Sequence, residues 1–213
     1  MTDQMVAQAA ETQTAPSPRW LTPGKGIQWL ITIAGLIGML AATELTNEKM
    51  KVLADPNYVP NCSLNPILSC GTVMSSPQAA AFGFSNTFLG IIAFSALLAI
   101  GVGMLAGARY HRWFWIGMQI GVVLGIVFVF WLQFQSIYSI QKLCLYCMIV
   151  WACTIPAFVG VTIFNFKTGV IALPEGGRRF FERLSRYAWA IVLVWYAIIF
   201  AAIIIKFPNV LVF

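Results

Sequence analysis

Five long apolar stretches constrain this chain more than any other feature. They cover residues 27–47, 87–107, 114–135, 144–166 and 187–206, and each is close to the ~20 residues that an α-helix needs to cross ~30 Å of hydrocarbon. Of the 213 residues, 60% are apolar and 9% are charged, whereas about a quarter are charged in soluble domains. The sequence therefore predicts an all-α integral membrane protein with five transmembrane helices.

Lysine and arginine are spread unevenly over the segments between these stretches. With the N-terminus inside, nine lie in inner segments and four in outer ones. Because cytoplasmic loops are enriched in positive residues, this bias favours the N-terminus inside and the C-terminus outside. The net charge of +6 then reflects orientation rather than nucleic-acid binding. The inner residues are Arg19, Lys25, Arg109, Arg112, Lys167, Arg178, Arg179, Arg183 and Arg186, and the outer ones are Lys49, Lys51, Lys142 and Lys206.

The chain divides into one membrane domain and two short tails. Residues 1–26 are polar and poor in bulky apolar side chains, so we expect a disordered cytoplasmic tail. The membrane domain covers 27–206 with its longest outer loop at 48–86, and 207–213 form an outer tail. The first apolar stretch is too long and starts too late for a signal peptide. The basic segment 175–186 also carries Phe180, Phe181 and Leu184, which favours contact with anionic lipid at the inner surface.

The outer loop contains two cysteines, Cys62 and Cys70. Turn-forming residues surround them, including Pro60, Asn65 and Pro66, so the loop can bring the two together. Disulfides persist in the outer compartment. This pair alone is equally compatible with a static disulfide that holds the loop and with a redox-active one.

A second pair, Cys144 and Cys147, opens the fourth apolar stretch on the same outer side. Positions i and i+3 share one helix face, and the unpaired N–H groups of a first turn stabilise a thiolate. Zinc is disfavoured, because the single histidine, His111, falls in an inner loop and the cysteine spacing is unusual for zinc. We therefore interpret the four cysteines as a redox relay. Cys153, about two turns into this helix, is interpreted as a packing residue.

A dithiol relay in a membrane needs an electron acceptor. One histidine is too few for haem ligation or for a metal triad, and the sequence has no Gly-rich dinucleotide fingerprint for a flavin. A lipid-soluble quinone suits the chemistry, because a thiolate can add to its ring and a second thiol can resolve the product. We expect a membrane quinone of the menaquinone or ubiquinone type, with no metal and no haem.

These features together resemble bacterial homologues of vitamin K epoxide reductase. The resemblance covers about 27–206 and rests on Cys62-x7-Cys70 in the first outer loop, Ser85-Asn86-Thr-Phe-Leu-Gly90 at the start of the second span, and Cys144-x-x-Cys147. It implies a four-helix bundle around a quinone pocket, a peripheral fifth helix and a short horizontal half-helix in the outer loop. Many members carry a fused thioredoxin-like domain after the fifth span. This sequence ends at Phe213 without one, so a separate thioredoxin-fold partner, soluble or membrane-anchored, is expected. The chain itself is expected in a bacterial cytoplasmic membrane.

The resemblance also implies a role for each cysteine. Cys62 and Cys70, as a disulfide, oxidise the partner, and Cys144 then attacks Cys70 to form a transient bridge. Cys147 faces the quinone and attacks its ring before Cys144 closes the CxxC disulfide again. The implied function is a quinone-dependent thiol oxidoreductase that supports disulfide formation in exported proteins.

The expected quinone contacts are Asn86, Trp151, Ser76, Val73 and Met74. The Asn86 amide would donate to a quinone carbonyl, or cap the second span. The animal enzymes of the family have a tyrosine where this chain has Trp151. This difference argues against epoxide reduction as an activity of the chain. Packing of the helix bundle is an equally good role for Trp151. Residues 75–84 predict a Ser-capped, Pro-initiated short helix that would cover the quinone with Val73 and Met74 near the ring, or anchor at the interface.

Two other functional classes remain compatible with parts of the sequence. A small transporter would place ionisable residues inside its spans, where the nearest candidates here are Gln119, Gln133 and Gln135. A non-catalytic membrane scaffold would use fixed structural disulfides. Trapping a mixed disulfide between Cys70 and a soluble protein separates that scaffold from a relay.

Overall fold

The computed structural model describes residues 20–55 and 57–208, and over this part of the chain five helices are long and apolar enough to cross a membrane. This confirms the predicted all-α, five-span membrane fold. A short amphipathic helix, α7 (Glu175–Leu184), and a 3-10 turn, η3 (Ser185–Tyr187), lead into the last of them. The five are α2 (Lys25–Ala54), α4 (Asn86–Leu105), α5 (Arg112–Phe134, continued by the π-helical turn η2, Gln135–Ile140), α6 (Leu145–Lys167) and α8 (Ala188–Lys206).

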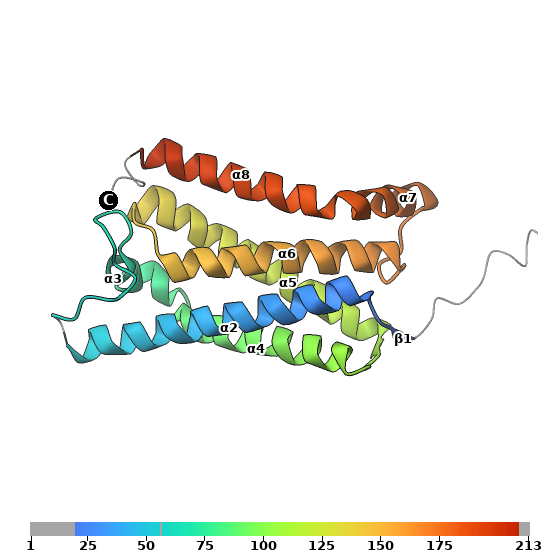
Figure 1. The fold of residues 1–213 in the computed structure, drawn as a ribbon, viewed down its shortest axis with the longest axis horizontal. Helices are drawn as coiled ribbons and strands as arrows, with labels where there is room; N and C mark the ends of the chain where they lie inside the picture. The colour runs from blue at the N-terminus through green and yellow to red at the C-terminus, as the bar shows by residue number, and fades with distance from the viewer. Residues whose placement is uncertain (1–19, 56, 209–213) are drawn as a thin grey trace, which may run out of the picture.

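Four of these helices form the bundle, and α8 lies at its edge. Helix α2 packs against α4 and α6, and α6 also packs against α5 and α8. Figure 1 shows α8 along one side of the molecule, next to α6, while α2 and α4 lie along the other. Within α8 only Ile203 is buried. The fifth helix is therefore peripheral, as the sequence predicts.

Helices α2 and α4 approach each other closely through glycines. A Cβ atom added at Gly35 would collide with the backbone of Leu98, and one added at Gly101 would collide with the backbone of Thr32. Small residues at such crossings let membrane helices pack by van der Waals contact, where lipid provides no hydrophobic driving force. The rigid α2–α4 pair fixes both ends of the first outer loop.

Helices α5 and α6 are joined by a buried polar network. The Asn165 amide donates to Gln119 Oε1 at 2.9 Å and to the Trp115 carbonyl at 3.2 Å, and the Gln119 amide donates to Thr162 Oγ1 at 3.0 Å. Hydrogen bonds of this kind hold membrane helices together. Gln119, one of the candidates for a transport pathway, is thus occupied in helix packing.

Both predicted ends of the first span shift in the structure. Trp20–Leu21 (β1) pair antiparallel with Tyr110–His111 (β2), and α2 starts at Lys25, so residues 20–26 of the predicted tail are ordered. Residues 1–19 lie outside the described part. At its other end α2 continues to Ala54 instead of stopping near residue 47. Charged residues end the apolar stretch there, yet the helix continues through them and carries an i,i+3 ion pair between Glu48 and Lys51.

The outer loop contains two short helical pieces where one half-helix was predicted. The first, α3 (Cys70–Met74), starts at a cysteine, and the second, the 3-10 turn η1 (Pro77–Ala80), has Ser76 at its N-cap and Pro77 at its first position. Gly83 follows with φ +82°, a conformation that costs glycine little. The start and stop of the second piece therefore match the sequence signals.

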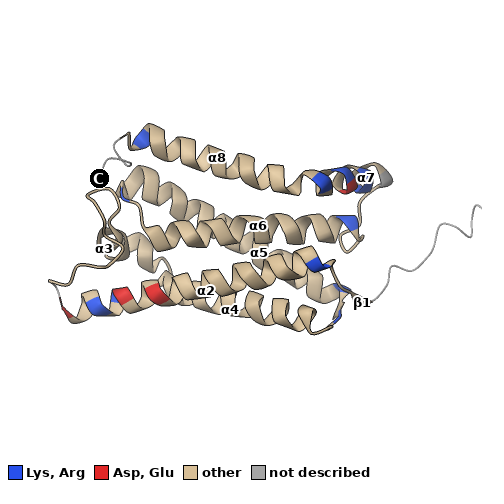
Figure 2. Ribbon diagram, viewed as in Figure 1, with Lys and Arg blue, Asp and Glu red and all other residues tan. Residues whose placement is uncertain are grey.

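The two ends of the bundle differ in charge. Figure 2 shows basic residues at both ends, whereas the acidic residues of α2 gather at the end that carries α3. At the opposite end α7 presents its basic residues, and Phe181 stacks on Phe166 of α6 with ring centroids 4.4 Å apart. Phe180 stays 59% exposed. A basic helix with exposed aromatic residues at a bundle end suits the interface of a membrane.

Candidate redox site

The loop cysteines form a disulfide at one end of the bundle. Cys62 and Cys70 are joined with their Cα atoms 5.7 Å apart, and they are 2% and 0% exposed. Asn65 shapes the turn between them, because its Oδ1 accepts hydrogen bonds from the N–H groups of Ile67 at 2.9 Å and Leu68 at 2.7 Å. The sulfur atoms are thus held inside the folded loop.

The loop is bound to the segment just before the CxxC pair. Leu68 and Leu143 form a parallel bridge, in which the Ser69 N–H donates to the Leu143 carbonyl at 3.0 Å and the Leu143 N–H donates to the Ile67 carbonyl at 2.9 Å. The Lys142 ammonium adds a third bond, to the Pro66 carbonyl at 2.6 Å. This register brings together one cysteine of each pair.

Cys70 and Cys144 accordingly share one buried cluster. They pack with Cys62, Leu45 and Met74, and Cys147 lies at the edge of the same cluster. Figure 1 shows α3 beside the start of α6 at one end of the bundle. The structure therefore brings all four predicted catalytic cysteines to one place.

Cys144 and Cys147 are free thiols at the N-terminus of α6. Cys144 is the buried N-cap residue, and Cys147 is half-buried in the first turn. A hydrogen bond from the Cys147 side chain lowers the pKa of Cys144, and the backbone N–H groups of Cys147 and Tyr146 add to this, against the opposing effect of burial. Cys144 is thus the sulfur on which this pair stabilises negative charge.

An irregular backbone segment just before α6 turns the Cys144–Cys147 pair toward the outer loop. After the π-helical turn η2, Gln141 adopts the left-handed conformation with φ 55°, which is uncommon outside glycine. The Lys142 N–H then donates to the Ser136 carbonyl at 3.2 Å. The chain consequently folds back on the end of α5 before α6 begins. Neither the π turn nor the left-handed residue has a sequence signature here.

Asn86 holds the short outer helix rather than capping α4. Its amide donates to the Gln78 carbonyl at 2.7 Å, and its Oδ1 accepts from the Ala81 N–H at 3.1 Å. The N-cap of α4 is Ser85, so the expected N-cap role of Asn86 is wrong. Because an amide has two N–H groups, one remains for another acceptor.

The three predicted contacts in the loop lie close to the cysteines. Met74 is buried in their cluster and Val73 packs against it. The Ser76 hydroxyl donates to the Val73 carbonyl at 2.7 Å, which ties the end of α3 to the start of η1. These residues form the side of the cysteine cluster that faces the short outer helix.

Trp151 lies one turn after Cys147 on α6, and Cys147 packs against the same cluster. In this cluster Trp151 is buried with Val129 of α5, Ile137 of η2 and Ile203 of α8. Together with Met148 it also lines an apolar cavity of about 400 Å³ between α6 and α8. In this position the indole packs the bundle, which was one of its two predicted roles. Cys153 is buried against Ala34, Phe94 and Ala157, as expected for a packing residue.

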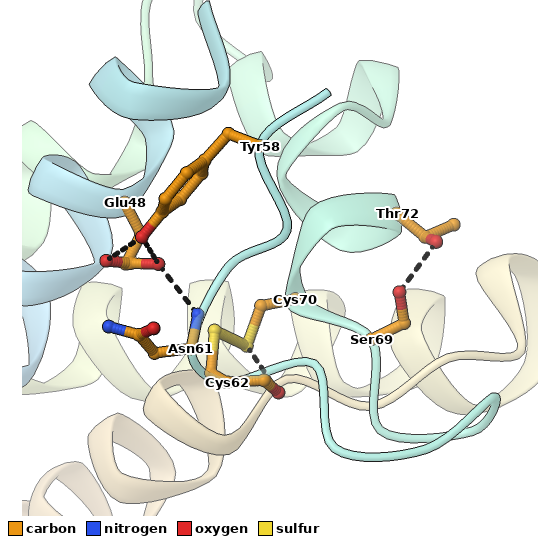
Figure 3. Close-up of a disulfide and its surroundings, with 7 residues drawn as sticks. All are labelled: Glu48, Tyr58, Asn61, Cys62, Ser69, Cys70 and Thr72. Atoms are coloured by element: carbon orange, nitrogen blue, oxygen red, sulfur yellow. Dashed lines mark hydrogen bonds between the residues drawn. A yellow bond between two sulfur atoms is a disulfide. The ribbon is translucent and has the colours of Figure 1, made fainter. Parts of the chain in front are cut away.

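Two buried polar residues are not among the predicted redox-site residues. Glu48, at the outer end of α2, is completely buried beside the loop disulfide, where Figure 3 shows its carboxylate bound to Tyr58 and to the backbone of Asn61. Gln133 of α5 is 6% exposed, and its amide nitrogen meets no acceptor among the described residues. A glutamate at the end of a membrane span is expected to face water, so the sequence carries no signal that Glu48 is buried.

The fold and the site define the class of this protein. Five spanning helices hold a loop disulfide against a thiol pair at a helix N-terminus, which is the arrangement of a membrane disulfide oxidoreductase. Over the described residues, no group of three or more His, Cys, Asp or Glu side chains is arranged to hold a metal ion.

The comparison with protein families gives the same class. Residues 29–162 match the vitamin K epoxide reductase family, and this range is more than half of the chain and contains all four cysteines. The chain belongs to this family. Comparison with individually curated proteins finds no match.

Proposed function

We propose that this protein reoxidises a thioredoxin-fold, disulfide-forming partner and passes two electrons through its two cysteine pairs to a membrane quinone. Disulfide formation in exported proteins would depend on this cycle. The observation that carries the proposal is the bridge between Leu68 and Leu143, because it aligns Cys70 with Cys144. A static loop disulfide would need no thiol pair beside it.

The first half of the cycle takes place at the loop. The partner's two thiols reduce the Cys62–Cys70 disulfide, so the partner gains a disulfide and the loop gains two thiols. The Cys70 thiolate then attacks Cys144 in an oxidised CxxC pair, and Cys147 leaves as a thiolate. Electron balance therefore makes Cys70 the nucleophile, the reverse of the direction expected from the resemblance.

The second half of the cycle restores both disulfides. Cys62 attacks Cys70, which closes the loop disulfide and releases Cys144 as a thiolate. The structure holds the pairs in this state, with the loop oxidised and Cys144 and Cys147 free. The lowered pKa of Cys144 keeps it ready to close on Cys147 once electrons leave through Cys147.

The residues around Cys147 fit a quinone. The buried amide nitrogen of Gln133 lacks an acceptor among the described residues, and a buried donor without a partner favours a ligand that supplies a carbonyl oxygen. Val129 of α5 and Ile137 of η2, four residues before and after Gln133, pack in the cluster that Cys147 adjoins. A bound quinone would accept two electrons and two protons.

Asn86, Val73, Met74, Ser76 and Trp151 are proposed as further quinone contacts. The second N–H of the Asn86 amide is one donor among them, while Val73 and Met74 supply apolar surface next to the cysteines. The short helix η1, which Asn86 holds in place, would cover this side of the site. Asn86 would then both position the cover and bind a carbonyl.

We further propose a bacterial cytoplasmic membrane with the N-terminus and α7 inside and the cysteines outside. The excess of basic residues at the α7 end supports this orientation, and anionic lipid would bind there. The thioredoxin-fold partner would then meet the loop in the compartment where disulfides persist.

The test is turnover of the purified full chain in lipid nanodiscs, with a reduced thioredoxin-fold protein as donor and ubiquinone or menaquinone as acceptor. Quinone reduction is followed by absorbance, and donor thiols are counted in parallel. We expect one quinone reduced for each donor dithiol. Absence of reduction with every quinone tested, from a chain that retains its loop disulfide, would contradict the proposal and favour a scaffold.

A further inference from the structure

Glu48 is the most completely buried charged side chain near the loop disulfide. It is 0% exposed, and every hydrogen bond to its carboxylate comes from the next thirteen residues of the chain. Lys51 Nζ lies 2.8 Å from Oε1, the Tyr58 hydroxyl donates to both oxygens at 3.1 Å, and the Asn61 N–H donates to Oε2 at 2.9 Å. Figure 3 shows the Tyr58 and Asn61 contacts next to the disulfide.

The burial of this carboxylate has to be explained by its donors. A buried ion costs several kcal/mol unless its hydrogen bonds are satisfied. Glu44, one turn earlier on α2, stays partly exposed. The Lys51 side chain is 48% exposed, so water weakens this ion pair. Lys51, the Tyr58 hydroxyl and the Asn61 N–H together allow Glu48 to remain charged inside the fold.

These donors immediately precede a redox cysteine. Asn61 is the residue before Cys62, and Pro60 is buried with its carbonyl accepting from the Ser63 N–H at 2.9 Å. The segment 58–62 is therefore fixed on α2 through Glu48. The other cysteine of the pair has a separate anchor, since Ser69 and Leu68 bind Leu143. One cysteine is attached to α2 and the other to the start of α6.

We propose that Glu48 is a positioning residue for Cys62: its carboxylate holds residues 58–62 on α2 and keeps the loop disulfide covered until this segment is released. The inference rests on the proposed function in treating Cys62–Cys70 as the pair that the partner reduces. Both cysteines are buried in the structure, in which this segment is bound: Cys62 is 2% and Cys70 0% exposed. Release at Glu48 exposes Cys62 and leaves Cys70 aligned with Cys144 through the separate bridge.

The experiment measures how fast a water-soluble phosphine, tris(2-carboxyethyl)phosphine, reduces the loop disulfide of the full chain in nanodiscs. Thiols are counted by maleimide-polymer gel shift after quenching. We expect Glu48→Ala to be reduced about tenfold faster than the wild type, which corresponds to the loss of about one charge-assisted hydrogen bond. Glu48→Gln should fall between them, because an amide oxygen still accepts but carries no charge. The matched control, Glu44→Gln, should stay within about twofold of the wild type.

A double-mutant cycle separates positioning from general destabilisation. Tyr58→Phe removes one donor and should speed reduction about threefold in the wild type, yet add nothing in Glu48→Ala, because the two residues act through one contact. Equal reduction rates for Glu48→Ala and the wild type at matched Tm would overturn the proposal. A double variant whose rate increase is the product of the increases in the two single variants would overturn it as well. If Glu48→Ala fails to fold, Glu48→Gln replaces it in the cycle; there Tyr58→Phe should speed reduction by less than the threefold seen in the wild type, because the amide oxygen accepts a weaker hydrogen bond. Phosphine reduction needs neither partner nor quinone, so its outcome is independent of whether the proposed turnover occurs.

Discussion

The two cysteine pairs are held in opposite ways. Cys144 is the N-cap residue of α6 and Cys147 lies in its first turn, so the start of one helix positions both. Cys62 and Cys70 lie in a loop whose position depends on contacts with two other parts of the chain, Glu48 of α2 and Leu143 before α6. Cys144 and Cys147 are the rigid pair, which suits a reaction with a ligand in the membrane. Cys62 and Cys70 are the loop pair, which is held by a few contacts that can be broken. This suits a pair that reacts in turn with a soluble protein and with the rigid pair.

The difference in hydrogen bonding matches the difference in redox state. The loop pair is a disulfide, while the helix pair is reduced and has a lowered pKa at Cys144. Helix N–H groups favour a thiolate, and a disulfide has no charge to stabilise. Cys144 lies in the same buried cluster as the loop disulfide, so the two pairs differ in their hydrogen bonds and not in their burial.

The largest effect is expected for Cys147→Ser, which removes the thiol of the rigid pair that faces the proposed quinone. A serine hydroxyl is far less acidic than a thiol and cannot form a disulfide, so turnover with a dithiol donor should fall by at least about 10³-fold. The measurement is steady-state quinone reduction by the folded variant in nanodiscs. The matched control is Cys153→Ser, a buried cysteine of the same helix outside the relay, which should retain turnover. Normal turnover by Cys147→Ser would show that Cys144 and Cys147 are not the pair that reduces the quinone.

Nearly as large an effect is expected for Cys144→Ser, which cuts the connection between the two pairs. The loop disulfide can still be reduced by the donor once, but its thiols then have no disulfide to attack. We expect one equivalent of donor oxidised per chain, followed by a stop, in a rapid-mixing assay of donor thiols with quinone present. Repeated turnover would show that electrons leave the loop by another route.

Much of the rigid pair and little of the loop pair could be predicted from sequence. Span lengths and hydropathy locate the five helices, and Cys144 and Cys147 fall at a helix start by local spacing alone. The bridge between Leu68 and Leu143 joins residues far apart in the sequence, so no local pattern encodes it. The π turn before Lys142 and the burial of Glu48 are also decided by tertiary contacts. Local sequence determines which way helical side chains point, whereas the register of a loop depends on its contacts with distant parts of the chain.

A tenfold effect is expected when the alignment of the two pairs is weakened without touching sulfur. Asn65→Ala removes the acceptor for the N–H groups of Ile67 and Leu68. Because a hydrogen bond contributes about 0.5–1.5 kcal/mol net, exchange between Cys70 and Cys144 should slow by about tenfold. Exchange is measured as the rate at which donor electrons reach the helix pair in a single turnover. Asn57→Ala, an exposed asparagine of the same loop, is the control, and equal slowing in both variants would exclude a specific role for the turn.

The smallest effect concerns the charge on the rigid pair. The side chain of Cys147 is the largest cause of the lowered pKa of Cys144, so Cys147→Ala should raise that pKa. A thiolate is the reactive form, and the rate of Cys144 alkylation therefore rises with pH and levels off above its pKa. In the wild type this plateau should begin at a lower pH than for an ordinary thiol, and in Cys147→Ala it should move to higher pH. Near neutral pH the variant should be alkylated about threefold more slowly, because a smaller fraction of Cys144 is then thiolate. Mass spectrometry assigns the alkylated site, with Cys153 as the internal reference. Superimposable pH profiles for the two proteins would mean that the backbone N–H groups of α6 alone lower the pKa of Cys144. The position of Cys144 at a helix start, and no contact between the two thiols, would then distinguish the helix pair from the loop pair.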